Sequence, residues 1–250
     1  MNKFSLHNFN ILITGASAGI GRACAVEASS LGAHCILTGR NEDALQETTK
    51  LCKHTTDIFV CDLKDTEAIK KMVANFKSID GVVHCAGITY PRPIKFLKPE
   101  HIKEIFDINY NAPVLLTAQL LQTHKMNDGA AFVFISSISS KHPYFGGATY
   151  VSSKAAIEAF SRTLAIEIAP KKMRSNVLLP ALVHTKMLED TKLATGEDKF
   201  TEYEKMHPLG FGQPEDVANA ACFLLSPEAK WITGSELKMD GGLLLNGKIK

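Results

Sequence analysis

The chain has 250 residues, of which 45% are hydrophobic and 22% are charged, ordinary proportions for a globular protein with a sizeable core. Its 28 Lys and Arg against 26 Asp and Glu leave a formal net charge of +2 without long basic runs, so we expect no nucleic-acid partner. The first ten residues do not resemble a signal peptide, and no segment approaches the roughly 20 apolar residues that span a bilayer, which predicts a cytoplasmic protein with no membrane partner.

The cysteines and histidines do not suggest a metal centre. The six cysteines are isolated and none belongs to a CxxC pair, so we expect reduced, mostly buried thiols. The nine histidines are dispersed and lack the HExxH spacing of a zinc site. The sequence therefore predicts no bound metal.

Short apolar runs alternate with segments of helical periodicity along the chain. The apolar runs predict strands at 9–14, 34–38, 57–61, 81–85, 131–136, 175–179 and 235–239. The periodic segments predict helices at 21–31, 42–50, 66–76, 99–121, 149–169 and 214–225. Residues 182–207 are polar and poorly periodic, and we expect a mobile segment over a site there.

This alternation predicts an α/β fold. Strand, helix and strand in succession favour a Rossmann-type doubly wound parallel sheet of about seven strands, with helices on both faces. We see no break in composition, so we expect residues 1–250 to form a single domain. Ligands of such folds bind at the carboxyl ends of the strands.

A glycine-rich turn at residues 14–21 joins the first strand to the first helix. Gly15 can take a positive φ there, and Gly19 and Gly21 let the backbone approach a pyrophosphate, whose charge a helix N-terminus favours. Such a turn can simply reverse the chain. Its position between the first strand and the first helix nevertheless favours dinucleotide binding.

Two residues, one after the second strand and one after the third, concern the binding of the dinucleotide. Where an NAD-binding protein usually has an acidic residue, the chain reads Thr38, Gly39, Arg40. The guanidinium of Arg40 can hold a 2′-phosphate, so we expect NADP(H), with NAD(H) as the second cofactor and an exposed turn arginine as the alternative. Asp62, after the third strand, could accept a hydrogen bond from adenine or cap the next helix.

Tyr150 and Lys154 lie four residues apart at the start of one helix, so both side chains project from the same face. A free phenol titrates at about 10, and a nearby ammonium lowers that pKa by favouring the phenolate. Ser137 ends the fifth strand, where its hydroxyl can come beside the phenol. A buried tyrosine with a surface lysine would explain the pair alone, but the glycine-rich turn favours catalysis. We expect His142 to be solvated.

Together these motifs resemble those of the short-chain dehydrogenase/reductase family over essentially the whole chain. The family's TGxxxGIG motif matches residues 14–21, and its YxxSK motif matches residues 150–154. The resemblance implies that Tyr150 exchanges a proton with a carbonyl or an alcohol while Ser137 orients the reacting oxygen. It also implies that Lys154 binds the nicotinamide ribose and lowers the tyrosine's pKa, and that Asn109 holds a water of the proton relay.

The resemblance further implies a set of cofactor contacts along the strand ends. These are Gly15, Ser17, Ala18, Gly19, Ile20, Gly21, Arg40, Asp62, Leu63, Ala86, Gly87, Tyr150, Lys154, Pro180, Val183 and Thr185. Two positions depart from the family: its NNAG reads His84, Cys85, Ala86, Gly87, and its PG reads Pro180, Ala181. The first departure replaces two side chains credited with steadying the sheet, and the second puts the fit of the substrate in question.

The sequence thus predicts hydride transfer between NADP(H) and a small-molecule carbonyl or secondary alcohol. Reductases of 3-oxoacyl-[acyl-carrier-protein], sugar dehydrogenases and hydroxysteroid dehydrogenases share these motifs, and the sequence does not separate them. The alternative is a dinucleotide-binding sensor or scaffold without chemistry, against which the intact catalytic residues argue. We also expect a homotetramer or homodimer, in which Leu243–Leu245 pack on a partner unless they complete the monomer's core.

Overall fold

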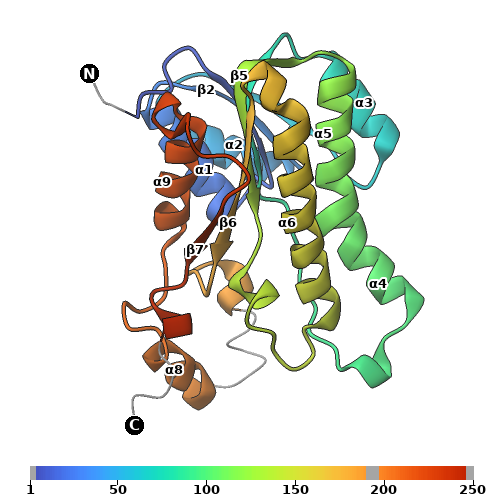
Figure 1. Cartoon of the computed structure of the whole chain (residues 1–250), viewed down its shortest axis with the longest axis vertical. Helices are drawn as coiled ribbons and strands as arrows, with labels where there is room; N and C mark the ends of the chain where they lie inside the picture. Colours follow the sequence, from blue (N-terminus) through green and yellow to red (C-terminus); the bar gives the residue numbers. More distant parts are fainter. Residues whose placement is uncertain (1–3, 190–196, 246–250) are drawn as a thin grey trace.

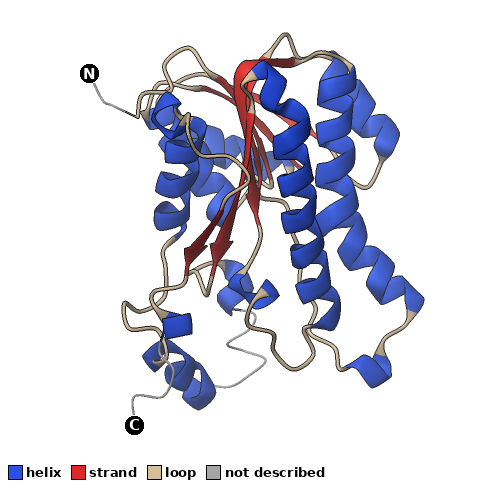
Figure 2. Cartoon of the chain, viewed as in Figure 1, coloured by secondary structure: helices blue, strands red, loops and turns tan. Residues whose placement is uncertain are grey.

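The computed structural model describes residues 4–189 and 197–245, and in that part of the chain a seven-stranded sheet forms the centre of the molecule (Figures 1 and 2). The strands are β1 (Asn10–Thr14), β2 (His34–Gly39), β3 (Thr56–Val60), β4 (Ile79–His84), β5 (Met126–Ile135), β6 (Arg174–Pro180) and β7 (Glu236–Met239). Their order is β3-β2-β1-β4-β5-β6-β7, and every neighbouring pair is parallel. The predicted doubly wound sheet is confirmed.

Helices cover both faces of the sheet (Figure 1). One face carries α1 (Gly19–Ser30), α2 (Glu42–Leu51) and α9 (Pro214–Leu225). The other carries α3 (Thr66–Ala74), α4 (Pro99–Phe106), α5 (Ala112–Gln122) and α6 (Ala148–Ile168). The strands β6 and β7 point toward the end of the molecule where α6 begins and where α8 (Glu197–Lys205) lies (Figure 2).

Each face of the sheet has its own hydrophobic core, because parallel strands are buried on both sides. Successive residues of β1 divide between the two cores: Ile11 and Ile13 face α1 and α9, whereas Leu12 faces α3, α5 and α6. No helix within the described residues has the length and apolarity needed to span a membrane. The six cysteines are free, and four of them are buried.

Apart from shifts of one or two residues at the ends of other elements, three predicted segments differ from those observed. The helix predicted at 99–121 is interrupted by a π-helical turn, Asp107–Asn111, between α4 and α5. The strand β5 begins at Met126, five residues before its predicted start, because the exposed residues 127–129 interrupt the apolar pattern. Residues 182–207 were expected to be a mobile segment but contain α8, whose Glu and Lys residues favour a helix without an apolar stripe. Residues 190–196 of that segment lie outside the described part.

His84 ends β4, and its side chain packs between the sheet and α5. It stands where the short-chain dehydrogenase/reductase motif, which the sequence resembles, has an asparagine. Its ring stacks on that of Phe134, with centroids 4.7 Å apart, and its Nε2 lies 3.1 Å from Oγ1 of Thr117 on α5. Burial lowers the pKa of His84 to about 3, so the ring is neutral near pH 7. The histidine therefore provides its own link between sheet and helix at this departure from the family motif.

We expect mild acid to destabilise the fold through His84. The pKa of His84 is about 3 in the folded chain and about 6.5 in an unfolded one, so between these values only the unfolded state takes up the proton. Relative to neutral pH, the free energy of unfolding should fall by about 2 kcal/mol at about pH 5 from this group alone. His84→Asn, which cannot titrate, should lose this part of the pH dependence in urea unfolding.

The matched control is His124→Asn, at an exposed position whose φ of +53° asparagine tolerates. This variant should keep the pH dependence of the natural chain. An equal pH dependence in both variants would contradict a buried, neutral His84.

Candidate active site

The turn between β1 and α1 forms a backbone cradle at the carboxyl edge of the sheet. Gly15 has a φ of +64° and Gly19 one of +52°, which residues with side chains rarely adopt. A Cβ on Gly15 would lie 2.9 Å from the Ala86 nitrogen, and one on Gly21 would lie 2.2 Å from the Gly15 oxygen. Only glycines let this turn close against the end of β4.

The first turn of α1 can receive an anion. Its N-cap residue is Ala18, which has no polar side chain to bond the first N–H groups, and its first turn contains no acidic residue. The N–H groups and the positive end of the helix dipole are therefore available to a phosphate. The cradle and this helix end fit the pyrophosphate of a dinucleotide.

Side chains that the sequence motifs did not reveal hold the cradle in place. Arg22 donates hydrogen bonds to the Ser17 carbonyl oxygen (2.6 Å) and to Thr48 Oγ1 (3.1 Å), and Thr48 donates to the Ala16 carbonyl oxygen (2.9 Å). Thr48 lies on α2, far from the turn in sequence, so local spacing could not identify it.

Thr14 makes the corresponding connection to β4. Its Oγ1 accepts hydrogen bonds from the backbone nitrogens of Cys85 and Ala86, each at 3.1 Å. The backbone turn after β4 therefore keeps its attachment to β1 although two side chains of the family motif are replaced.

The candidate 2′-phosphate site lies where β2 ends. Arg40 is exposed, and a Cβ on the preceding Gly39 would lie 3.6 Å from Ser17 Oγ. The Ser17 hydroxyl and the residue before Arg40 are therefore neighbours, so two of the predicted cofactor residues lie at one edge of the cradle.

Asp62 follows β3, and one of its two predicted roles is wrong. Asp65 is the N-cap of α3 and accepts hydrogen bonds from the nitrogens of Glu67 (2.9 Å) and Ala68 (3.2 Å). Asp62 instead accepts one from the Lys64 nitrogen (3.0 Å). A contact of Asp62, or of the buried Leu63 beside it, with adenine stays a prediction.

The predicted catalytic side chains meet between β5 and α6. Ser137 is buried at the end of β5, where its hydroxyl lies beside the side chain of Tyr150 in the first turn of α6. The Ser137 hydroxyl donates its hydrogen to Ser139 Oγ (3.0 Å). Lys154, one helical turn after the tyrosine, donates from Nζ to the Ile135 carbonyl oxygen (2.8 Å) and lies 5.6 Å from the centre of the Tyr150 ring.

Burial sets the ionisation of this pair. It raises the pKa of Tyr150 to about 12, and the neighbouring Ser137 side chain opposes that rise. Burial also lowers the pKa of Lys154 to about 8. The expected acidification of the phenol by Lys154 is therefore not seen here, because the ammonium is directed to the Ile135 carbonyl and desolvation of the phenolate dominates. The phenol is protonated at neutral pH.

Asn109 lies in the π-helical turn and connects the loop after β4 to α6. Its Oδ1 accepts from the Ile88 nitrogen (2.9 Å), and its Nδ2 donates to the Ile88 oxygen (2.9 Å) and to Ser153 Oγ (3.1 Å). The Ser153 hydroxyl in turn donates to the Tyr150 carbonyl oxygen (2.8 Å). A Cβ on Gly87 would lie 3.4 Å from Asn109 Oδ1. The structure thus brings Asn109 to the catalytic helix, and its role toward a water stays a prediction.

The segment after β6 borders the cradle from the other side. A Cβ on Gly19 would lie 3.2 Å from Thr185 Cγ2, so two predicted cofactor residues lie side by side. Val183 is buried and forms a β-bridge with Gly212. The nitrogen of Ala181, which replaces the family glycine, donates to the Met239 oxygen (2.9 Å).

Two further sequence expectations concern the surface of the molecule. His142 is exposed, as expected for a solvated loop residue. Leu245 is 88% exposed, so the three C-terminal leucines do not all complete the monomer's core.

Comparison with known proteins identifies the family. A family model described as enoyl-(acyl carrier protein) reductase matches residues 15–244, which include both the cradle and the catalytic set. The chain belongs to the short-chain dehydrogenase/reductase family. It is accordingly an oxidoreductase that acts on CH–OH or carbonyl groups with NAD(P).

Three family members illustrate the similarity. The 3-oxoacyl-[acyl-carrier-protein] reductase FabG of Rickettsia bellii is 34% identical, over 94% of this chain and 96% of that protein. The L-xylulose reductase of Mesocricetus auratus is 31% identical, over 94% of this chain and 96% of that protein. A Beutenbergia cavernae structure assigned as an NAD(P)-dependent gluconate 5-dehydrogenase, with bound NADP at low occupancy, is 28% identical, covers 98% of this chain and 100% of its own, and has a TM-score of 0.88.

Gly15→Ala should weaken NAD(P)H binding by this short-chain dehydrogenase/reductase. The new methyl group would press on the Ala86 nitrogen, and the left-handed backbone would cost about 1–2 kcal/mol. Gly129→Ala is the matched control, because Gly129 has a φ of +80° and a Cβ there meets nothing within 4 Å. In fluorescence titrations only Gly15→Ala should lose affinity, although urea unfolding should show a loss of stability in both. Natural affinity in Gly15→Ala would contradict the cradle.

Proposed function

We propose that this chain reduces a ketone to a secondary alcohol with NADPH, reversibly, and that Tyr150 gives the proton. The observation that carries the proposal is the half-buried phenol, which has the Ser137 side chain beside it and the buried Lys154 one helical turn later. The glycine cradle at the same edge of the sheet supports a dinucleotide beside this set.

The three side chains have separate tasks. Tyr150, with a pKa of about 12, stays protonated at neutral pH and can give its proton to a carbonyl oxygen. The Ser137 hydroxyl can orient that oxygen. Lys154, with a pKa of about 8, is largely protonated, and its ammonium would bind the nicotinamide ribose of the cofactor.

The residues of the cradle would hold the cofactor. Gly15, Gly19 and the N-terminus of α1 fit its pyrophosphate, and Arg40 with Ser17 fits a 2′-phosphate. When bound, NADPH supplies the hydride. Asn109 would keep the loop after β4 on α6 during the reaction.

The first substrate to test is a 3-oxoacyl group, because a relative that is 34% identical is named as a 3-oxoacyl-[acyl-carrier-protein] reductase. A sugar ketone is the second, because a relative that is 31% identical is named as an L-xylulose reductase. A cytoplasmic location and a homotetramer or homodimer complete the proposal and stay predictions. A sensor without chemistry would bind NADPH and leave its absorbance unchanged in the presence of both substrate classes.

Tyr150→Phe should abolish turnover and leave NADPH binding almost unchanged, because it removes only the hydroxyl that gives the proton. The measurement is the loss of NADPH absorbance with a 3-oxoacyl thioester or a sugar ketone, beside a fluorescence titration of NADPH. Tyr110→Phe is the control, because it removes the hydroxyl of a tyrosine whose ring packs on Phe106. Turnover retained in Tyr150→Phe would refute the assignment of the proton donor.

Arg40→Asp should reverse the preference for NADPH over NADH. An aspartate repels a 2′-phosphate and can accept hydrogen bonds from a ribose hydroxyl, so the ratio of the two kcat/KM values should fall by about tenfold or more. Lys53→Asp makes the same change of charge at an exposed position after α2 and should leave the ratio unchanged. A ratio unaltered by Arg40→Asp would mean that Arg40 does not hold the phosphate.

A further inference from the structure

A charged side chain to which neither the motifs nor the proposed function gives a role lies buried beside the catalytic set. Glu158 is on α6, four residues after Lys154, and is 2% exposed. Its Oε1 accepts a hydrogen bond from Ser136 Oγ (2.5 Å), and its Oε2 accepts one from Lys141 Nζ (2.8 Å). A buried carboxylate is costly unless it is paired and hydrogen-bonded. These two donors therefore stabilise Glu158 inside the protein.

Ser136 connects the carboxylate to the end of β5. It directly precedes Ser137, and its hydroxyl also lies 3.2 Å from the Lys154 carbonyl oxygen. Its backbone nitrogen donates to the Leu178 oxygen of β6 (2.8 Å). The strand end that carries Ser137 is thereby fixed to the part of α6 that carries Lys154.

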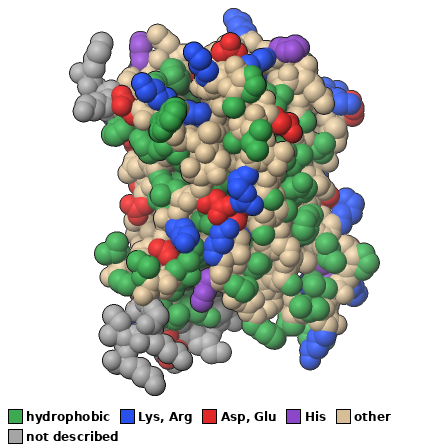
Figure 3. Space-filling view, in the orientation of Figure 1, with side chains coloured by type: hydrophobic (Ala, Val, Ile, Leu, Met, Phe, Trp, Pro, Cys, Tyr) green, Lys and Arg blue, Asp and Glu red, His purple; other side chains and the backbone are tan. Residues whose placement is uncertain are grey.

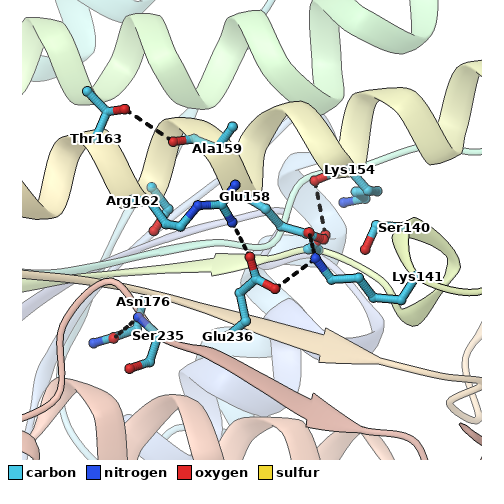
Figure 4. Close-up of polar contacts among 12 residues, drawn as sticks. Ser140, Lys141, Lys154, Glu158, Ala159, Arg162, Thr163, Asn176, Ser235 and Glu236 are labelled. Atoms are coloured by element: carbon cyan, nitrogen blue, oxygen red, sulfur yellow. Dashed lines mark hydrogen bonds and ion pairs between the residues drawn. The ribbon is translucent and has the colours of Figure 1, made fainter.

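Lys141 makes the second connection, after the short 3-10 turn Ile138–Ser140. Its Nζ lies 2.8 Å from Glu158 Oε2 and 2.8 Å from Glu236 Oε2 of β7. Glu236 also pairs with Arg162 of α6, so the network joins α6 to the start of β7 (Figure 4). In the space-filling view, acidic and basic side chains gather near the middle of the face that is drawn (Figure 3).

The two connections enclose the catalytic serine. Ser136 lies immediately before Ser137 and Lys141 lies four residues after it, and both donate to the same carboxylate. A carboxylate suits this place because each of its oxygens accepts from one donor. Glutamine has only one oxygen and would turn an NH₂ group toward the other donor.

We propose that Glu158 is a positioning residue, which holds the Ser137 hydroxyl beside Tyr150 by accepting hydrogen bonds from Ser136 and Lys141 on either side of Ser137. It acts through these neighbours and takes no proton. As far as it concerns catalysis, this inference rests on the proposed function. The alternative is a general brace that stabilises α6 on the sheet without any effect on the placement of Ser137.

Two variants weaken the network and a third is the control. Glu158→Gln keeps the shape of the side chain but satisfies only one donor, and Ser136→Ala removes one hydroxyl. Ser161→Ala is the control, because Ser161 Oγ makes a buried hydrogen bond with Ser175 Oγ (2.7 Å) between the same helix and β6. This bond lies farther along α6 than Glu158 does, so its loss weakens the attachment of the helix without changing the loop of Ser137.

The kinetic result separates positioning from simple stabilisation. We expect kcat to fall by about tenfold to a hundredfold in Glu158→Gln and in Ser136→Ala, with little change in the Kd for NADPH, because misplacement by about 1 Å has effects of this size. Ser161→Ala should lose stability in urea unfolding and keep its kcat. The proposal is overturned if Glu158→Gln keeps the natural kcat, or if kcat in all three variants falls in proportion to stability.

Crystal structures of the same variants give a readout that does not depend on turnover. We expect the Ser137 hydroxyl to move away from the Tyr150 hydroxyl in Glu158→Gln or Ser136→Ala and to keep its place in Ser161→Ala. If the natural chain reduces no carbonyl compound, the proposed function fails, but these structures still decide whether Glu158 places Ser137. An unchanged position of the Ser137 hydroxyl relative to Tyr150 in both network variants would overturn the inference.

Discussion

The packing of α6 against the carboxyl end of β5 is the constraint on which the site depends. The strand supplies Ser137 and the helix supplies Tyr150 and Lys154, so their mutual placement is set by how the helix lies on the sheet. Lys154 contributes directly, because its buried Nζ donates to the carbonyl oxygen of Ile135, two residues before the serine. One hydrogen bond thus joins the helix to the strand end while it keeps the ammonium beside the phenol.

Burial sets the protonation state of the titratable groups in this region. Desolvation raises the pKa of Tyr150 and lowers that of Lys154, which brings a protonated phenol next to an amine that can exchange protons near neutrality. Behind the site, desolvation keeps His84 neutral, so that it stacks on Phe134 without a buried charge. The same low-polarity interior supports both the chemistry and the packing.

Local spacing determined much of this protein. Apolar runs and helical periodicity predicted the parallel sheet and most helices, because each pattern reflects contacts repeated within one element. The glycine turn was predictable as well, since Gly15 and Gly21 are needed by the backbone itself. Tyr150 and Lys154 share a helix face at four residues' distance, so their proximity also follows from the sequence.

The tertiary structure decided what depends on residues far apart in the chain. It brought Ser137 to Tyr150, joined Arg22 to Thr48, and enclosed Glu158 between Ser136 and Lys141. It also raised the pKa of Tyr150, which the sequence predicted to be lowered. The spacing in the sequence indicates that a cation is near, but only the packed molecule determines how much water the phenol loses. Sequence patterns report periodicity within an element, but contacts between elements and burial arise only when the sheet and its helices pack together.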